Sequence, residues 1–557
     1  MITLNNINLS SIDLSGIDLR GIKLGLEGRG GGSGDGFPQL PGDVTRWHFG
    51  GLTNEMMAAM DDPRIEDADH KGRFLSFKNF AWKGMSGVGG YVTNKDIYEY
   101  DLDRYSYTFI ENSTKVHDFY IVFELIGYDE NFKDGFNLDV RSISQGLKYK
   151  KTYTKNGIYI FQYKDEEGLD DLFAIGYNGN GGARSNFTVK ILPLYPGFIL
   201  GDGVDDFAVT ENNLDLEDTY TIYTPLILLK YGGVVCGKSS DTDFSLNTVI
   251  SSKSIGFDSA NAWSGSIPVD LFEFVLVACK RSPQTMYVKD LVTGKSNQNK
   301  SKEFVPNPRE YFVWRNVGGI WCQVAIAGQI ICNGYYSTDE DDEKVLDWYK
   351  KQYPWLFFDQ AWTVVGKTNE DEDRATIANI TGNGNDLVLS NFGFAEGSGY
   401  NEQGEYEGYL VTDGVDDKID SSAFKMGEDF TVVGEWTLLQ NINVSSLRKQ
   451  SSFIIRNNDL GLSLFINRIS HATLIHTKSL RAFCSNGVLY KSDWTEQIDT
   501  TPQDITSSNS ELLIASHYDN KSEYDKIAFK NLAIYPTVLS KDDCIKAYNY
   551  LQTLKAK

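Results

Sequence analysis

Apolar and polar positions alternate in short runs along most of the chain. Runs such as DFTVVGEWTLLQ, from Asp429, and IAFKNLAIYP, from Ile527, are rich in Val, Ile, Phe and Tyr. Asn, Asp, Gly and Ser bound these runs. Short β-rich runs separated by turn residues are typical of antiparallel sandwiches made of two sheets. The pattern therefore predicts an all-β fold.

Three motifs occur twice in this strand-rich sequence, which indicates an internal duplication. They are WHFGGLTNE and WTVVGKTNE from Trp47 and Trp362, NFAWKGMSGVGGY and NFGFAEGSGY from Asn79 and Asn391, and GFILGDGVDDF and GYLVTDGVDDK from Gly197 and Gly408. Between its second and third motifs, the first copy carries a long stretch that the second copy lacks. This stretch has short β runs of its own, so we expect it to fold separately as a small sandwich.

The duplication divides the chain into five expected segments. They are an N-terminal anchor (1–25), a Gly-rich tether (26–44), module A (45–91 plus 192–355), an inserted β-sandwich (92–191) and module B (356–557). Modules A and B are expected to be tandem antiparallel jelly-roll sandwiches, each of which ends in a short helix. Ser337 and Ser540 are the predicted N-caps of these helices. Each helix is expected to cover an open end or edge of its sandwich.

Ile–Leu pairs repeat every five residues near the start of the chain. The apolar positions are Ile7, Leu9, Ile12, Leu14, Ile17, Leu19, Ile22 and Leu24. So short a run cannot offset the entropy of ordering its backbone, about 1–2 kcal/mol per residue. We therefore expect a β-type anchor that either intertwines three copies of the chain in a homotrimer or adds a strand to a partner's sheet. Docking onto module A of the same chain is the alternative.

The charge balance narrows the choice of partners. With 53 Lys and Arg against 76 Asp and Glu, the formal net charge is −23, which disfavours nucleic acid and anionic membranes as ligands. No apolar run is long enough to predict a membrane-spanning helix, and no secretory leader is expected. The six cysteines form no CxxC pair and are expected to be buried thiols.

Acidic residues offer the clearest candidate chemistry. The two DGVDD motifs bring together Asp202, Asp205 and Asp206, and Asp413, Asp416 and Asp417. These carboxylates either bind calcium, which takes oxygen ligands, or belong to tight turns. A turn is the favoured interpretation, with Val204 and Val415 pointing inward. Apart from calcium, no cofactor and no metal are expected.

The repeated motifs carry a family resemblance. GDGVDDF and TDGVDDK, followed by EDTYTIY and GEDFTVV, resemble the opening of concanavalin A-like, laminin-G-type jelly rolls. The string TNEDEDRATIANITGNGNDLVLSNF resembles lectin-fold modules in virion structural proteins of tailed phages of gut bacteria, crAss-like phages among them, and the N-terminal run resembles pentapeptide repeats. The resemblance implies a head or tail fibre, made in the host bacterial cytoplasm and exposed on the virion, with other virion proteins as partners and bacterial surface glycans as ligands.

Two alternatives stay open beside the virion interpretation. One is a bacterial carbohydrate-binding or glycan-cleaving protein, and the other is a capsid decoration or spacer protein without a ligand. The paired carboxylates of a retaining glycosidase are missing at the required spacing, and no hydrolase, phosphate-binding or zinc motif occurs in its proper context. The protein is therefore expected not to be an enzyme.

A sugar bound by such modules would stack on an exposed aromatic side chain. Trp263, Trp314, Trp436 and Trp494 are the residues that could serve. Core packing is the favoured interpretation of each tryptophan. The sequence alone therefore leaves the glycan-binding residues unknown.

Overall fold

A computed structural model describes most of the chain from Phe37 onward. The described residues are 37–69, 71–90, 97–100, 118–128, 136–142, 144–154, 156–164, 172–176, 187–238, 244–260, 262–304, 310–315, 320–403, 406–439, 445–449, 453–458, 461–466, 473–475, 480–492, 494–498, 508–515 and 524–557. The eight apolar residues of the expected anchor lie outside them.

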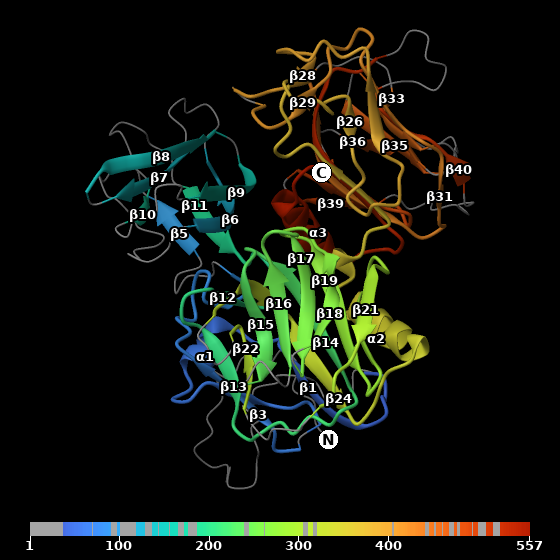
Figure 1. The fold of residues 1–557 in the computed structure, drawn as a ribbon. Helices are drawn as coiled ribbons and strands as arrows, with labels where there is room; N and C mark the ends of the chain where they lie inside the picture. Colours follow the sequence, from blue (N-terminus) through green and yellow to red (C-terminus); the bar gives the residue numbers. More distant parts are fainter. Residues whose placement is uncertain are drawn as a thin grey trace, which may run out of the picture.

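Module A is a sandwich of two antiparallel sheets (Figure 1). Sheet A1 has the order β21 (Ser296–Lys300), β20 (Thr285–Asp290), β19 (Phe274–Arg281), β14 (Tyr220–Leu228), β23 (Gln323–Ile326), β12 (Ile199–Asp202) and β4 (Gly87–Val88), with β24 (Gly328–Asn333) joining β14 to β1 (Asp43–His48). Sheet A2 has the order β18 (Ala262–Pro268), β17 (Ser254–Ser259), β16 (Ser245–Val249), β15 (Gly233–Lys238), β22 (Tyr311–Val313), β13 (Phe207–Thr210), β3 (Phe74–Lys78) and β2 (Arg64–Glu66). A short helix, α1 (Asn54–Ala58), follows β1.

Module B has two sheets with the same strand orders as module A. Sheet B1 runs β28 (Gly399–Tyr400), β29 (Leu410–Val411), β42 (Ile527–Tyr535), β32 (Thr431–Leu438), β37 (Leu480–Cys484), β38 (Val488–Lys491) and β39 (Glu496–Ile498), with β25 (Gln360–Thr363) on β42. Sheet B2 runs β26 (Thr376–Ile377), β27 (Leu387–Ser390), β30 (Lys418–Ser421), β41 (Leu512–Ile514), β33 (Ser445–Lys449), β34 (Phe453–Asn458), β35 (Gly461–Ile466) and β36 (Thr473–Ile475). A separate pair joins β31 (Phe424–Met426) to β40 (Ser508–Ser510). The duplicated motifs thus belong to a duplicated fold.

Two small antiparallel sheets lie in the chain between β4 and β12. One has the order β10 (Leu172–Gly176), β7 (Phe136–Ser142) and β8 (Gly146–Tyr153), and the other β5 (Ile97–Tyr100), β11 (Phe187–Leu192), β6 (Asp118–Ile126) and β9 (Gly157–Lys164). Figure 1 shows them together as a unit beside modules A and B. We call this unit the inserted domain.

Each sandwich ends in a helix that lies on the outer face of a sheet. Successive strand residues point to opposite faces, so on β14 Ile222 joins the core inside module A while Tyr223 joins a second core that contains helix α2 (Asp339–Gln352). On β32, Val432 joins the core inside module B, while Val433 joins the second core, which also contains helix α3 (Lys541–Thr553). The expectation that the helices cover an open end or edge is therefore wrong, because their apolar stripes cover the outer apolar face of A1 or B1.

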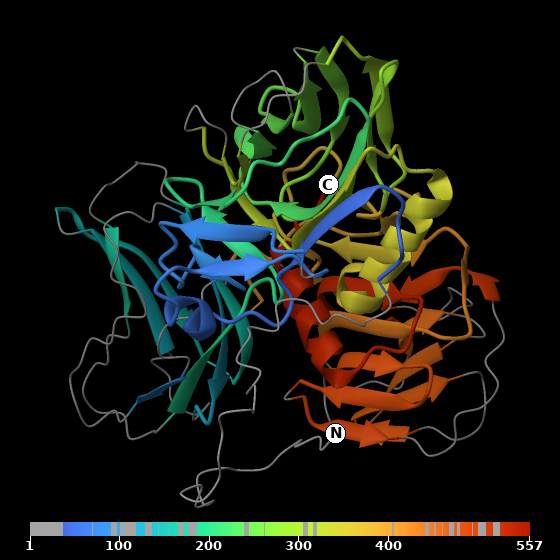
Figure 2. The ribbon, with the colours of Figure 1, turned by 90° about the horizontal axis from the view of Figure 1, so that it is seen from below.

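The second core joins the three parts of the molecule. It contains Phe123 of the inserted domain, Tyr223 of module A and Tyr548 of α3, all of them buried. A short 3-10 helix, η2 (Pro354–Leu356), links α2 to β25. Figure 2 shows α3 between the sheets of modules A and B, with the inserted domain to one side. We call this shared cluster the joint core.

The fold confirms the expected all-β class of tandem antiparallel sandwiches, each of which ends in a helix. None of the helices in the described ranges has the length and hydropathy needed to span a membrane. The six cysteines, Cys236, Cys279, Cys322, Cys332, Cys484 and Cys544, are buried free thiols, which agrees with the expectation from their spacing. Phe37 packs edge-on against Trp348 of α2 at 5.1 Å, so the part of the expected tether that is described lies on module A.

Candidate functional site: the cleft between the sandwiches

A cleft of ≈ 830 Å³ opens where modules A and B meet. One wall comes from module A, through the start of β19, the turn after β20 and the C-terminal half of α2. The other wall comes from module B, through loop residues 380–383, the segment 536–539 and α3. Pro354, Leu356, Phe357 and Phe358, from the segment that links the modules, lie between the two walls and form the floor.

Aromatic rings dominate the floor of the cleft. Phe357 and Phe358 are half-buried. Phe357 meets Phe274 edge-on at 5.3 Å, and Phe358 stacks on the ring of Tyr550 at 6.4 Å. These contacts fix the orientation of both phenylalanine rings at the surface of the cleft.

The rim of the cleft carries charged and amide groups. Asp347, Lys350 and Lys351 on α2, and Asp359 and Asn383 opposite, are exposed. The Asn383 side-chain amide donates a hydrogen bond to the Asp359 carbonyl oxygen at 3.3 Å. The cleft therefore combines an apolar aromatic floor with hydrogen-bonding groups of both kinds.

Lys557 connects the two modules at the edge of this cleft. Its Nζ lies 3.1 Å from Glu273 Oε1 and 3.2 Å from Asp270 Oδ2, both in module A. The same Nζ donates a hydrogen bond to the Ile380 carbonyl oxygen in module B at 2.7 Å. Burial raises the pKa of Glu273 to about 7, with Lys557 lowering it and Asp270 raising it.

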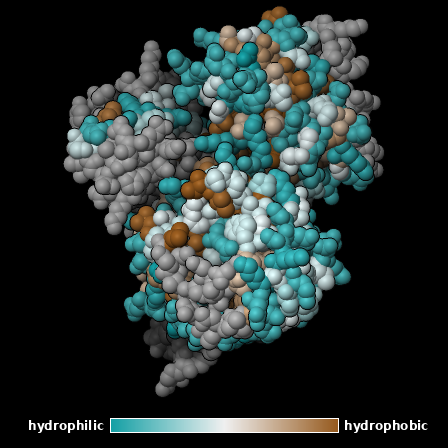
Figure 3. Space-filling model, in the orientation of Figure 1, coloured by the Kyte–Doolittle hydropathy of each residue, from teal (hydrophilic) through white to brown (hydrophobic). Residues whose placement is uncertain are grey.

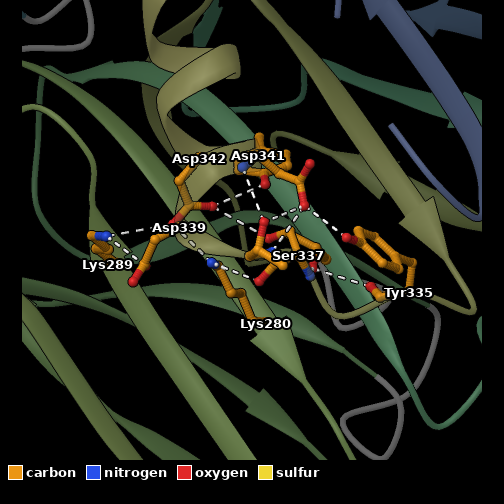
Figure 4. Close-up of polar contacts among 10 residues, drawn as sticks. Lys280, Lys289, Tyr335, Ser337, Asp339, Asp341 and Asp342 are labelled. Carbon is orange, nitrogen blue, oxygen red and sulfur yellow. Dashed lines mark hydrogen bonds and ion pairs between the residues drawn. The ribbon is translucent and has the colours of Figure 1, made fainter. Parts of the chain in front are cut away.

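A buried polar network anchors the helix that forms one wall of the cleft (Figure 4). Lys280 Nζ on β19 lies 2.7 Å from Asp342 Oδ2, and both side chains are only 3% exposed. Lys280 also donates to the Ser337 carbonyl oxygen at 3.1 Å, and the Tyr223 hydroxyl donates to Asp342 Oδ1 at 3.0 Å. Burial, with the neighbouring Asp342 adding to it, raises the pKa of Tyr223. Since these charges are enclosed, their role is to hold α2 on sheet A1.

The start of α2 differs by one residue from the prediction. Thr338, and not Ser337, is the N-cap, and it exchanges capping-box hydrogen bonds with Asp341. Ser337 instead lies in the network of Figure 4, where its hydroxyl donates to Asp342 at 3.3 Å. Ser540 caps α3 as predicted, accepting a hydrogen bond from the Asp543 amide.

The two DGVDD loops have the same hydrogen bonds. In module A, Asp202 Oδ1 accepts from the amides of Val204 and Asp205 at 2.7 and 3.3 Å. The buried Asp206 carboxylate accepts from the Asp202 amide at 2.9 Å and from the Ser86 hydroxyl at 3.0 Å.

In module B, Asp413, Asp417 and Ser398 repeat this arrangement. The Asp413 amide donates to Asp417 at 2.7 Å, and the Ser398 hydroxyl donates to Asp417 at 3.0 Å. Asp413 Oδ1 in turn accepts from the Val415 amide at 2.7 Å. Both loops are therefore turns closed by side-chain carboxylates.

Calcium does not fit the inner oxygens of these loops well. The three carboxylates of each loop come within 4.8 Å of one another, but calcium requires six to eight oxygens, and the inner oxygens already accept protein hydrogen bonds. Burial and neighbouring carboxylates raise the pKa of Asp206 to about 8 and that of Asp417 to about 6. Calcium binding at either loop stays the less favoured of the two interpretations that the sequence left open. Val204 and Val415 are 48% and 70% exposed, so the expectation that they point inward is wrong: they occupy the tips of the turns.

The other repeated residues complete the same structural unit. Asn54 exchanges two hydrogen bonds with the backbone of Val88, and Asn369 does the same with Tyr400. The repeated Asn of the TNE motif thus clamps the short strand that lies within the second motif, β4 in module A and β28 in module B. These repeats were informative about fold, and the structure gives them no separate chemical role.

The four tryptophans that the sequence pointed to differ in exposure. Trp314, Trp436 and Trp494 are buried, as favoured. Trp263, on β18, is half-buried. The residues of the cleft were missed, because contacts between modules leave no periodic pattern in the sequence.

Comparisons with known proteins give no family for this chain. No family model matches it, and no curated protein matches it. Among solved structures, the chain is similar to the exoplasmic/lumenal domain of VIP36 in its Ca²⁺-bound form, with 7% identity and a TM-score of 0.20 over 26% of this chain and 86% of that one. It is also similar to the binding domain of botulinum neurotoxin DC in complex with SialylT, with 10% identity and a TM-score of 0.25 over 60% of this chain and 87% of that one. A heptameric SAP-like pentraxin from Limulus polyphemus is similar at 11% identity and a TM-score of 0.19, over 25% of this chain and 73% of that one. Likenesses this low do not assign a function.

Proposed function

We propose that this chain is a non-catalytic structural protein of a phage particle, a head or tail fibre, which binds glycans in the cleft between modules A and B. The cleft is the observation that supports glycan binding. Its volume of ≈ 830 Å³ lies within the range of about 300–1,000 Å³ that is usual for ligand sites, and such sites favour boundaries between domains.

The lining of the cleft matches the two sides of a sugar ring. Phe357 and Phe358 present aromatic surface on which the apolar C–H face of a pyranose can pack. Asp347 and Asn383 present oxygen acceptors for hydroxyl groups, and Lys351 presents a donor. No part of this arrangement requires a metal ion.

One observation favours glycan cleavage as a second candidate function. The pKa of Glu273, raised to about 7, is suited to a general acid, and glycoside hydrolases use a carboxylic acid of that kind. Glu273 Oε1, however, lies 3.1 Å from Lys557 Nζ. This ion pair already explains why a carboxylate is partly buried where modules A and B meet. We therefore favour binding without cleavage.

Glycan binding can be tested on the full-length protein with an array of bacterial capsular and cell-wall oligosaccharides. We expect saturable binding that Asn383→Ala weakens about tenfold, or ~1.4 kcal/mol. Asn212→Ala, which truncates an exposed asparagine in the loop after β13, is the matched control. Absence of binding across the array would contradict the proposed function, and equal loss in both variants would exclude the cleft as the site.

Assembly through the N-terminal segment needs a separate experiment. Light scattering can compare the full-length protein with a shortened protein that begins at Phe37, which keeps the contact between Phe37 and Trp348. We expect the mass of a trimer for the first and of a monomer for the second. Monomers in both cases would show that residues 7–24 do not assemble the protein with itself.

A further inference from the structure

We propose that the outer face of strands β16–β18 in module A is a second sugar-binding surface, which takes a neutral pyranose ring on Trp263. This inference rests on the proposed function and adds a site outside the cleft. We call the surface formed by Trp263, Asn247, Asp258 and Asn297 the Trp263 face. In Figure 1 these strands lie on the near side of module A.

The backbone beneath Trp263 is shaped to hold its indole ring at the surface. Asp258 pairs with Trp263 in the β17–β18 register, so their side chains share one face of the sheet. Gly256 lies two residues before Asp258 and therefore on the same face. A Cβ atom at Gly256 would come within 2.6 Å of the indole Cζ2. The missing side chain lets the ring lie against the sheet, where it is half-buried.

Polar side chains beside the ring are held in fixed orientations. The Asn247 amide donates to the Ser245 carbonyl oxygen at 3.0 Å and to Asp258 Oδ2 at 3.2 Å. The Ser245 hydroxyl donates to Asn247 Oδ1 at 3.0 Å. These bonds distinguish the oxygen of the Asn247 side-chain amide from its nitrogen. They also orient that oxygen and the Asp258 carboxylate along the strands. A site whose side chains are ordered in advance loses less entropy when a ligand binds.

A third polar group reaches β18, the edge strand of this surface, from the other sheet of the sandwich. Asn297 lies on β21, whose residues are all exposed, and its side-chain amide donates to the Ser266 carbonyl oxygen of β18 at 3.1 Å. Gly265 permits this approach, because a Cβ atom there would come within 2.6 Å of Asn297 Cγ. Polar groups of β16 and β17 thus share the face of Trp263, and a polar group of β21 lies against the backbone of β18.

The chemistry of this face specifies a neutral sugar. Indole surface packs on C–H groups, while carboxylate and amide oxygens accept hydrogen bonds from hydroxyl groups. An anionic ligand would be repelled by Asp258 and by a chain of net charge −23. Figure 3 shows a pale area on this side of module A, with brown atoms above and beside it and a teal area on its other side.

The test measures how tightly the full-length protein binds to an array of neutral hexose and N-acetylhexosamine oligosaccharides. In a protein that already carries Asn383→Ala, so that the cleft does not mask the change, we expect Trp263→Ala to weaken the remaining binding about tenfold, or ~1.4 kcal/mol, and Asn297→Ala to weaken it several-fold. Trp263→Tyr, which keeps an aromatic ring, should retain most of the binding, and Asn212→Ala should change nothing. Thermal unfolding of each variant shows whether the fold is kept, and the exposed Asn297 provides a variant that leaves the sandwich core intact.

The possible results separate this site from the proposed function. Binding that persists in Trp263→Ala and in Asn297→Ala but falls in Asn383→Ala would overturn the Trp263 face and leave the cleft in place. A protein that binds none of these oligosaccharides would overturn glycan binding and, with it, this inference. Loss in Trp263→Ala that Trp263→Tyr restores would support the Trp263 face.

Discussion

Single side chains in the repeated motifs act mainly on the backbone. Ser86 and Ser398 donate to buried carboxylates, and Asn54 and Asn369 clamp strand backbones in the two modules. The sequence predicted that these positions repeat and that the DGVDD motifs form turns. It could not predict the partner of each side chain, because the three motifs are far apart in the chain and meet only in the folded module.

A calcium titration tests the turn interpretation at the residue scale. Because the inner oxygens of Asp202 and Asp206 already accept hydrogen bonds, we expect the melting temperature to be the same in about 1 mM calcium and in EDTA. A calcium-dependent rise that Asp205→Asn removes would show that the loop is a metal site.

Glu273 gives the molecule a specific dependence on pH. Its folded-state pKa is about 7, above the ordinary value of 4.5, so between these values the folded protein holds a proton that the unfolded chain has lost. The free energy of unfolding should therefore fall as the pH rises through this window. We expect Glu273→Gln to make that fall shallower in urea unfolding measured from about pH 4.5 to 8. An identical pH profile in the variant and the parent would contradict the raised pKa.

At the scale of elements, the existence of the two terminal helices was predictable and their location was not. Capping residues and apolar spacing mark where a helix begins and which stripe is buried, but they do not say which surface receives it. Tyr223 and Val433 show what was missing: their strands are buried on both faces along most of their length, as in a sheet that is covered on both sides. The exposure of Trp263 could not be predicted from the sequence either, because it depends on Gly256 in the neighbouring strand.

The network that holds α2 predicts a defined pattern of mutational effects. Lys280→Met leaves the buried Asp342 with only the more distant Lys289, whose Nζ lies 3.5 Å from Asp342 Oδ2. Asp342→Asn leaves the buried Lys280 without its carboxylate. Each variant should lower the free energy of unfolding by about 3–5 kcal/mol. The double variant Lys280→Met/Asp342→Asn should lose clearly less than the sum of the two single variants, as measured in a double-mutant cycle.

Lys350→Met is the matched control on the same helix. It removes an exposed lysine 3.7 Å from Asp347, and the expected change in the free energy of unfolding is about 0–1 kcal/mol. Additive losses in the cycle, or a control as damaging as Lys280→Met, would contradict the role assigned to the network.

At the scale of the whole molecule, one shared core connects what the sequence presented as separate segments. Phe123, Tyr223 and Tyr548 come from three parts of the chain and belong to the same buried cluster. Glu435 of β32 adds a polar contact in module B at this joint, 3.2 Å from Arg481 and 3.5 Å from Lys530. Lys530 and Arg481 lower the pKa of Glu435 to about 2 against the effect of burial.

The joint core predicts that the modules unfold together. Because separating them would expose buried aromatic surface, we expect a single cooperative transition in scanning calorimetry of the full-length protein. Two transitions separated by many degrees would show that the joint core contributes little to the stability of the protein.

Titration of one oligosaccharide selected on the array into the full-length protein, followed by mass spectrometry of the recovered sugar, tests the central claim most directly. The account predicts saturable binding, weakened by Asn383→Ala and unchanged by Asn212→Ala, with the sugar recovered intact. Recovery of a cleaved sugar, or a protein that binds none of the oligosaccharides on the array, would contradict this account.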